Sequence, residues 1–141
     1  MHPVYNELKS SPASQKPTVL LLVENEVLIR RGTARYLRLR GFEVLEATSV
    51  DEAEGFFTAG VAIDIVFSDI KLGPRDGVEL ARWIGSHFPQ VPVILTSGVP
   101  SALPAAEDCS HIVEFIEKPY SPLAVEQRIQ ALVPRRDAVG P

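Results

Sequence analysis

The 141-residue chain contains one cysteine, no excess of basic residues and no long hydrophobic run. Cys109 cannot form a disulfide within the chain, so a reducing compartment, the cytoplasm, is the simpler expectation. The formal net charge of -4 argues against nucleic acid as a partner, because neutralising phosphates requires a basic surface. No segment approaches the ~20 consecutive apolar residues that cross a membrane, so membrane insertion is not expected.

Both ends of the chain are also poor in apolar residues. Residues 1–16 combine prolines, serines and mixed charge without the apolar core of a signal peptide, which predicts a flexible N-terminal leader. Residues 134–141 are predicted to form a C-terminal tail. The segment between them, residues 17–133, has the length of one compact domain, and neither end is long enough for a second.

Within residues 17–133, strand and helix signals alternate. Val19–Val23, Ile63–Phe67 and Pro92–Thr96 are short, nearly continuous apolar runs, typical of strands covered on both faces. Phe42–Ala47 and His111–Ile116 alternate more between polar and apolar residues, as strands nearer the edges of a sheet do. This pattern predicts three central strands and two outer ones.

Five helix-length segments separate and follow these strands. Four of them are amphipathic, and they cover Glu26–Arg40 with Gly41 behind it, a stretch that begins at Ser49, Asp76–Phe88, and a stretch that opens with Ser121-Pro122. The fifth, Pro100–Cys109, predicts only a short or irregular helix because it contains Pro104 and few large apolar residues. Strands that alternate with helices predict an α/β fold with a parallel sheet.

Polar residues follow four of the predicted strands, at the edge where parallel α/β sheets bind ligands. Glu24 and Asn25 follow the first strand, Asp69 the third, Ser97 the fourth and Lys118 the fifth. Oxygen ligands suit Mg²⁺, a hydroxyl and an amine can bind phosphoryl oxygens, and an aspartate can be the nucleophile. Each residue alone also has a plainer interpretation as a strand terminator, a turn residue or a solvated lysine. Their joint placement favours the functional interpretation.

Four motifs in order give the chain a resemblance to the receiver domain of bacterial two-component response regulators, over residues 17–133. They are LLLVENE, VFSDIKLGPRDGVEL, PVILTSG and FIEKPYSPLAV. The resemblance implies a flavodoxin-like (βα)5 fold, in which a doubly wound sheet of five parallel strands has the order 2-1-3-4-5. It also implies a single-domain response regulator that accepts a phosphoryl group from a histidine kinase or a histidine phosphotransfer protein.

The resemblance assigns a role to each motif residue. Asp69 would be the phosphoacceptor, with Ser97 and Lys118 as the residues that assist the transfer. Phe115 and Ser97 would form the conformational switch, and the Lys118–Pro119 peptide bond would be cis. Apart from slow self-catalysed phosphorylation and dephosphorylation, no enzymatic activity is implied, and no organic cofactor is expected.

The implied metal site holds Mg²⁺ through Glu24, Asn25, Asp69 and the backbone carbonyl of Lys71. Asn25 departs from the family pattern, which normally has a carboxylate at this position, so Mg²⁺ binding is expected to be weak. In the alternative hypothesis, the protein is a pseudo-receiver that acts as a phosphorylation-independent interaction module. The resemblance further implies an unknown downstream protein partner and a monomer or weak dimer.

Two further features leave alternatives open. The predicted first helix carries five arginines, which suit either a solvated face or a docking surface for an acidic partner: Arg30, Arg31, Arg35, Arg38 and Arg40. Trp83 lies off the apolar stripe of its helix and could cover a gap or make an exposed contact. A flavin or nucleotide binder is the weaker alternative function, because no Gly-rich phosphate loop follows the first strand.

Overall fold

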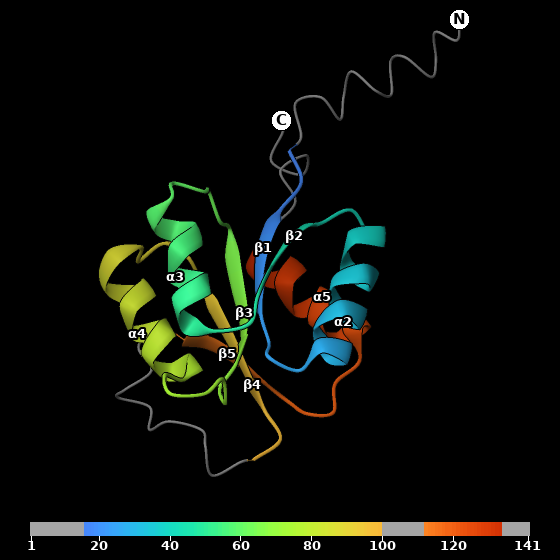
Figure 1. The fold of residues 1–141 in the computed structure, drawn as a ribbon. Helices are drawn as coiled ribbons and strands as arrows, with labels where there is room; N and C mark the ends of the chain where they lie inside the picture. Colours follow the sequence, from blue (N-terminus) through green and yellow to red (C-terminus); the bar gives the residue numbers. More distant parts are fainter. Residues whose placement is uncertain (1–15, 100–111, 134–141) are drawn as a thin grey trace, which may run out of the picture.

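The computed structural model of the protein describes residues 16–99 and 112–133. Its five strands form one parallel sheet in the order β2-β1-β3-β4-β5 (Figure 1). The strands are β1 (Val19–Val23), β2 (Glu43–Ala47), β3 (Ile65–Asp69), β4 (Val93–Ser97) and β5 (Ile112–Glu117). The predicted α/β fold and its strand order are therefore confirmed, with the two more alternating strands at the edges.

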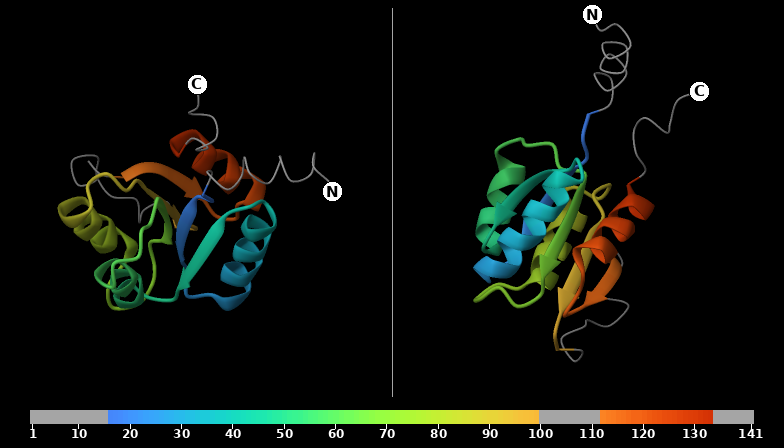
Figure 2. Two further views of the ribbon diagram at one scale, coloured as in Figure 1. Left: turned by 90° about the horizontal axis from the view of Figure 1, so that it is seen from above. Right: turned by 90° about the vertical axis from the view of Figure 1, so that its right-hand side faces the viewer.

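Helices cover both faces of the sheet (Figures 1 and 2). One layer consists of α2 (Val27–Leu39) and α5 (Pro122–Leu132), and the other of α3 (Val50–Thr58) and α4 (Gly77–His87). The sheet has a buried apolar cluster on each of its faces, because its central strands alternate between the two faces. The helix predicted at Pro100–Cys109, with Cys109, lies outside the described residues.

Local signals set the ends of the helices. Ser49, Asp76 and Ser121 accept backbone N–H groups at the starts of α3, α4 and α5, and Asp76 forms a complete capping box with Glu79. Gly41 has a φ of 99° after α2, where the N–H of Phe42 donates to the Leu37 carbonyl. Helix α2 differs at its start, because Glu26 makes no side-chain capping bond.

The third strand begins two residues later than the sequence indicated, at Ile65 instead of Ile63. Ile63 is buried, but it precedes the hydrogen-bonded ladder, and Asp64 next to it bonds with its N–H and its carboxylate to the backbone of Val19. An apolar run marks burial and does not specify which residues pair. The ladder instead continues through Asp69, which pairs with Thr96.

The fourth and fifth strands likewise end one residue later than predicted, at Ser97 and Glu117. The sequence had suggested that Asp69 and Ser97 follow their strands. In the structure, both are the last residues of their strands. Their backbones are held in the sheet, which fixes the positions of both side chains. No helix in residues 16–99 and 112–133 is long and apolar enough to cross a membrane.

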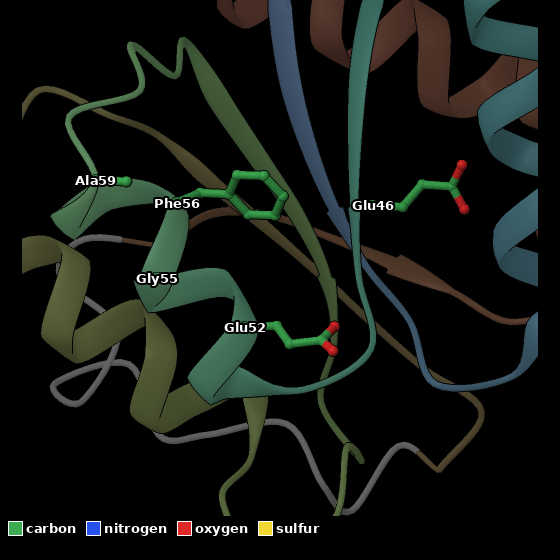
Figure 3. Close-up of a pocket in the computed structure, with 5 residues that line it drawn as sticks. All are labelled: Glu46, Glu52, Gly55, Phe56 and Ala59. Atoms are coloured by element: carbon green, nitrogen blue, oxygen red, sulfur yellow. The ribbon is translucent and has the colours of Figure 1, made fainter.

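A groove of about 500 Å³ lies beside β2 and α3 (Figure 3). Glu52 and Phe56 of α3, with Ala59 directly behind the helix, lie on one side of β2, and Glu46 projects from the strand toward α2. The edge strand therefore directs one acidic side chain to the helix layer on the opposite face of the sheet.

Candidate functional site

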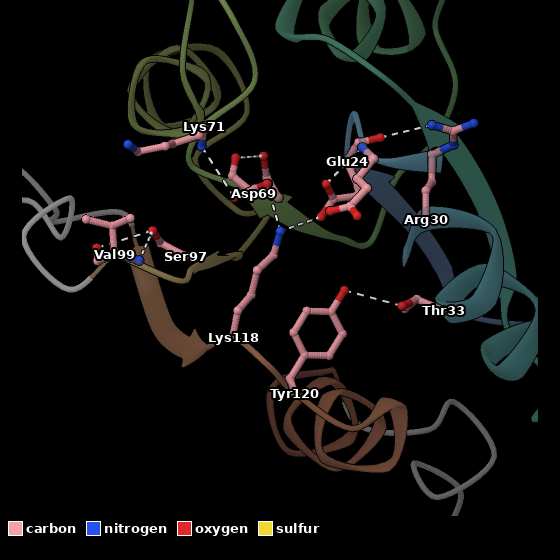
Figure 4. Close-up of polar contacts among 11 residues, drawn as sticks. Glu24, Arg30, Thr33, Asp69, Lys71, Ser97, Val99, Lys118 and Tyr120 are labelled. Carbon is pink, nitrogen blue, oxygen red and sulfur yellow. Dashed lines mark hydrogen bonds and ion pairs between the residues drawn. The ribbon is translucent and has the colours of Figure 1, made fainter. Parts of the chain in front are cut away.

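Three of the predicted residues meet at the carboxyl edge of the sheet (Figure 4). The Nζ atom of Lys118 donates a hydrogen bond to Asp69 Oδ2 at 2.9 Å. The same nitrogen lies 3.0 Å from Glu24 Oε1, where it forms an ion pair without hydrogen-bond geometry. One ammonium group thus neutralises part of the charge of two carboxylates. The three side chains come from three different segments of the chain.

Glu24 is almost completely enclosed, with 1% of its surface exposed. Its carboxylate Oε2 accepts the Glu26 N–H at 3.0 Å, and its own N–H donates to the Ala47 carbonyl at 3.0 Å. Burial raises the pKa of Glu24, while the bond from Glu26 and the contact with Lys118 oppose this rise and the charge of Asp69 adds to it. A cation at this position would therefore stabilise the ionised carboxylate.

Lys118 remains positively charged although it is partly buried. Burial lowers its pKa, but the contacts with Asp69 and Glu24 outweigh burial and raise the pKa above the ordinary value of 10.5. The Lys118–Pro119 peptide bond is cis, as the resemblance implied. The ring of Tyr120 packs edge-on against Phe67, with centroids 5.2 Å apart.

Asp69 is 6% exposed and is supported from the following loop. Its Oδ1 atom accepts the Lys71 N–H at 3.3 Å, and the Gly77 N–H donates to the Ile70 carbonyl at 2.8 Å. A Cβ atom at position 77 would lie 2.3 Å from the Asp69 carbonyl oxygen, which is closer than atoms can approach. Glycine at the start of α4 is therefore a requirement of this close packing.

The other predicted site residues, Ser97 and Phe115, lie in β4 and β5, the two strands that follow β3 across the sheet. The Ser97 hydroxyl accepts the Val99 N–H at 3.0 Å and donates to the Val99 carbonyl at 3.2 Å. Thr96 Oγ1 is buried and has no hydrogen-bond partner among the described residues. Phe115 is half-buried and packs against the apolar cluster on the α3 and α4 side.

The charges and oxygen atoms of this edge fit a divalent cation. Glu24, Asp69 and Lys118 together leave one negative charge uncompensated, and Mg²⁺ commonly uses only one or two carboxylates while keeping several waters. Asn25 is exposed and could add an amide oxygen, and the Lys71 carbonyl could add another. The described residues 16–99 and 112–133 contain no metal-binding group of three or more His, Cys, Asp or Glu side chains, and this edge offers two carboxylates with the amide and carbonyl oxygens.

Two residues that support this edge were not predicted from the sequence. Arg30 donates from Nη1 to the Glu24 carbonyl at 3.1 Å, and the Tyr120 hydroxyl shares a hydrogen bond of 3.3 Å with Thr33 of α2. Neither bond has a signal in the local sequence, because each joins residues from separate elements or across a helix start. The FIEKPYSPLAV motif contains Tyr120, but its spacing does not indicate the partner.

The interpretation of the five arginines as a solvated face is wrong for Arg30, whose side chain is only 12% exposed, whereas Arg38 and Arg40 are exposed and also form ion pairs. Arg30 and Arg38 pair with Glu46 of β2, and Arg40 pairs with Glu126 of α5. Carboxylates on neighbouring elements capture these guanidinium groups, which helix periodicity alone does not show. The remaining two, Arg31 and Arg35, are exposed. Trp83 covers the gap between α3 and α4, with its ring centroid 5.8 Å from that of Phe57.

A parallel sheet of this order, with two carboxylates and a lysine at its carboxyl edge, defines a class of signalling domain. Comparison with known families agrees, because the family model of the response regulator receiver domain matches residues 20–130. The chain belongs to this family, whose members act in two-component signalling. Receiver domains are phosphoacceptors and generally bind Mg²⁺ at the phosphorylation site.

Individual relatives support the assignment. The sensor kinase CckA of Brucella abortus is 31% identical over 131 residues, which cover 92% of this chain and 14% of the kinase. The C4-dicarboxylate transport transcriptional regulatory protein DctD of Rhizobium meliloti is 35% identical over 111 residues, covering 77% of this chain and 23% of that regulator. This chain therefore spans less than a quarter of either relative.

A solved structure shows the same architecture. The receiver domain of NtrX from Brucella abortus has a TM-score of 0.72 and 28% sequence identity to this chain. The match covers 81% of this chain and 97% of that domain. The similarity thus extends over nearly the whole of a receiver domain.

Proposed function

We propose that Asp69 accepts a phosphoryl group from a histidine kinase or a histidine phosphotransfer protein, and that phosphorylation changes affinity for a downstream protein. The observation that carries this proposal is the position of Lys118 Nζ, 2.9 Å from Asp69 and 3.0 Å from Glu24. A buried carboxylate beside a fixed ammonium group can receive a phosphoryl group whose oxygens the ammonium then binds. We assign the receiver unit to residues 17–133, with a leader over residues 1–16 and a tail over residues 134–141.

In the proposed step, a carboxylate oxygen of Asp69 forms a bond to phosphorus while the bond from phosphorus to the donor histidine nitrogen breaks. The electron pair of that bond stays on the imidazole nitrogen, which takes up a proton. Lys118 then moves from the free carboxylate to a phosphoryl oxygen. Ser97 would have to exchange its bonds with Val99 for a phosphoryl oxygen, and Phe115 would respond as the aromatic part of the switch.

The proposed metal ligands are the side chains of Glu24, Asn25 and Asp69 and the backbone carbonyl of Lys71. When bound, Mg²⁺ would offset negative charge on the phosphoryl oxygens. Glu24 is held in place by its bond from Glu26, so it needs little rearrangement to bind the metal. Asn25 contributes an oxygen without a charge, so its attraction for the cation is weaker than that of a carboxylate. At ~4 Å and a dielectric constant of ~20, the difference is up to ~4 kcal/mol per unit charge of the cation, before desolvation is included.

A cleft beside the site suits the proposed donor. It has a volume of about 590 Å³, and its lining includes Leu28 and Ile29 of α2, with Pro119 and Pro122 before and at the start of α5. Leu28 is 80% exposed and lies beside Ile29 in this lining, so the cleft offers an apolar surface to a partner. We propose that the histidine-bearing partner presents an apolar helix surface to this cleft. Acidic residues beside that surface would face the exposed arginines of α2.

One observation favours the alternative function, a phosphorylation-independent interaction module. Asn25 is exposed and uncharged, and the Lys118 ammonium group contacts both carboxylates and offsets part of their charge. A domain of this kind would keep the fold and the cleft and would bind its partner without accepting a phosphoryl group.

Phosphorylation with a small-molecule donor separates the two functions. The protein and its Asp69→Asn variant are incubated with Mg²⁺ and acetyl phosphate, and the intact masses are measured. A phosphoryl adduct on the wild type alone supports phosphoryl transfer to Asp69. An equal adduct on both proteins contradicts the assignment of Asp69.

If neither protein gains an adduct, the Asn25→Asp variant tests the role of the amide. Restored labelling together with tighter Mg²⁺ binding would show that the missing carboxylate prevents the reaction, which supports the interaction module. A variant that stays unlabelled and binds Mg²⁺ no more tightly would contradict the proposed role of Asn25 in metal binding.

A further inference from the structure

A guanidinium group links the loop between β1 and α2 to the edge strand β2. Arg30 donates from Nη1 to the Glu24 carbonyl oxygen at 3.1 Å and from Nε to Glu46 Oε1 at 3.0 Å (Figure 4 shows the first bond). Its side chain is only 12% exposed, and that of Glu46 is 20% exposed. The Arg30 and Glu46 side chains are therefore largely shielded from water. Hydrogen bonds to charged groups are stronger in such a shielded environment than in water.

Helix geometry explains why Arg30 reaches this loop. Side chains on a helix point back toward its N-terminus, and Arg30 lies in the first turn of α2, which begins at Val27. Helices α3, α4 and α5 each begin with a capping side chain, whereas Glu26 makes no capping bond at the start of α2. The start of α2 is therefore not fixed by a cap, and the bond from Arg30 is a separate restraint on the preceding loop.

We propose that Arg30 is a positioning residue for the metal site, which rests on the proposed phosphoacceptor function. The peptide group between Glu24 and Asn25 is planar, so fixing the Glu24 carbonyl also fixes the direction of the Asn25 N–H and Cα. Arg30 thereby orients both proposed ligands of this loop without contacting the metal. Groups that orient metal ligands commonly alter metal affinity by about 10- to 100-fold when they are removed.

Asn25 makes this restraint more important. A carboxylate at this position would be drawn to the cation by its charge, whereas an amide relies more on the direction in which its oxygen is held. The bond from Arg30 to the Glu24 carbonyl supplies that direction through the backbone. The restraint from Arg30 thus compensates in part for the lost charge.

Arg38 provides a matched control in the same helix. Its Nη1 atom pairs with the other oxygen of Glu46 at 2.8 Å, and its Nη2 atom donates to the Val44 carbonyl, so it shares the carboxylate but does not contact the loop. The Arg38→Gln variant removes one cation from Glu46, as Arg30→Gln does. Only Arg30→Gln also removes the bond to the Glu24 carbonyl.

Two measurements on the full chain test the proposal. Mg²⁺ affinity is measured by calorimetric titration, and exchange of the Glu26 amide hydrogen is measured by NMR without metal. The Glu26 N–H bonds to the Glu24 carboxylate, so its exchange rate reports whether this loop stays in place independently of metal binding and phosphorylation. Urea unfolding of both variants shows whether their overall stabilities match.

We expect Arg30→Gln to weaken Mg²⁺ binding about tenfold and to accelerate Glu26 exchange, with little change of either in Arg38→Gln. Arg30→Lys keeps the charge but has a single donor nitrogen in place of the separated Nε and Nη1 atoms of the guanidinium group, so it should lie between the wild type and Arg30→Gln. Equal effects of Arg30→Gln and Arg38→Gln, or unchanged Glu26 exchange in Arg30→Gln, would overturn the proposal. A wild type that does not bind Mg²⁺ would refute the proposed metal site, and the exchange rates would still decide whether Arg30 positions the loop.

Discussion

The two helical layers of this receiver domain are joined in different ways. Between α2 and α5, the Tyr36 hydroxyl donates to Glu126 Oε1 at 2.9 Å, and Arg40 Nε donates to Glu126 Oε2 at 2.9 Å. Between α3 and α4, the Phe57 ring lies 4.7 Å from that of Phe88 and 5.8 Å from that of Trp83. One layer is joined by directional polar bonds and the other by aromatic packing.

This difference follows the position of the proposed site. Tyr120, which follows the site residue Lys118, bonds to Thr33 of α2, so the polar layer borders the site directly. Directional bonds favour one arrangement of α2 and α5, because a displaced helix would leave buried polar groups without partners. Apolar packing contributes more to stability but depends less on orientation. The aromatic layer is thus expected to dominate stability, and the polar layer to fix the geometry near Lys118.

The largest effect should come from breaking the aromatic layer. Phe57 is 4% exposed and contacts rings on α4 and behind it, so Phe57→Ala is expected to lower the free energy of unfolding by about 3–5 kcal/mol. Urea unfolding measures this change. Phe56→Ala, on the same helix beside the groove, should cost clearly less because Phe56 is only half-buried. Equal losses for the two variants would contradict the importance assigned to this ring cluster.

An intermediate effect is expected from the polar layer. Glu126 is 3% exposed, and Glu126→Ala would leave the Tyr36 hydroxyl and the Arg40 guanidinium without their acceptor. The expected loss in the free energy of unfolding is about 1–3 kcal/mol, since Arg40 is half-exposed and regains water. NMR shifts of Tyr120 and Lys118 should change as well, whereas Phe57→Ala should leave them nearly unaltered. Unchanged shifts in Glu126→Ala would separate the polar layer from the site.

A smaller, pH-dependent effect is expected at Glu46. Burial raises the pKa of Glu46, but Arg38 and Arg30 outweigh burial and bring the pKa below the ordinary value of 4.5. A lowered pKa means that the ionised group stabilises the fold above pH 4.5 and that this contribution is lost as pH falls through the folded-state pKa. Glu46→Gln should therefore cost no more than about 1 kcal/mol at neutral pH, and the difference from the wild type should shrink in acid. Unfolding curves across pH check this prediction, and a difference that grows in acid would contradict it.

The smallest effect should come from a surface link beside the aromatic layer. Arg75 pairs with Asp51 and Glu54 of α3, but the Asp51 side chain is 82% exposed, so water and salt screen much of this attraction. Arg75→Ala should shift the urea midpoint only slightly downward, and added salt should reduce the shift further. A large loss of stability at high salt would show that the loop before α4 depends on this link.

The sequence predicted the strands and the helices of both layers, but not the polar contacts that join α2 to α5. Apolar periodicity predicted the helices of both layers but not their pairing, and β1 was predicted with its observed bounds because its apolar run is continuous and stops before Glu24. The capture of Arg40 by Glu126 could not be predicted, since 86 residues separate them and only the fold brings them together.

The site itself divides in the same manner. The spacing of residues after the strands predicted that Glu24, Asp69 and Lys118 would meet, because parallel strands end at one edge. The spacing did not predict that one ammonium group would contact both carboxylates, or that Arg30 would bond to the Glu24 carbonyl. Both contacts depend on side-chain directions, which spacing does not encode. The proposed roles of Ser97 and Phe115 stay predictions.

The aromatic residues also give the two layers separate optical signals. The only tryptophan, Trp83, lies in the aromatic layer, and its ring stacks on His87 at 4.7 Å. Tyr36 and Tyr120 lie in the polar layer, each with its hydroxyl in a hydrogen bond. Indole emission therefore reports on α3 and α4, whereas Tyr36 and Tyr120, two of the three tyrosines, report on α2 and on the segment before α5. The unmodified chain can thus reveal, without added labels, which layer responds when a phosphodonor or a partner binds.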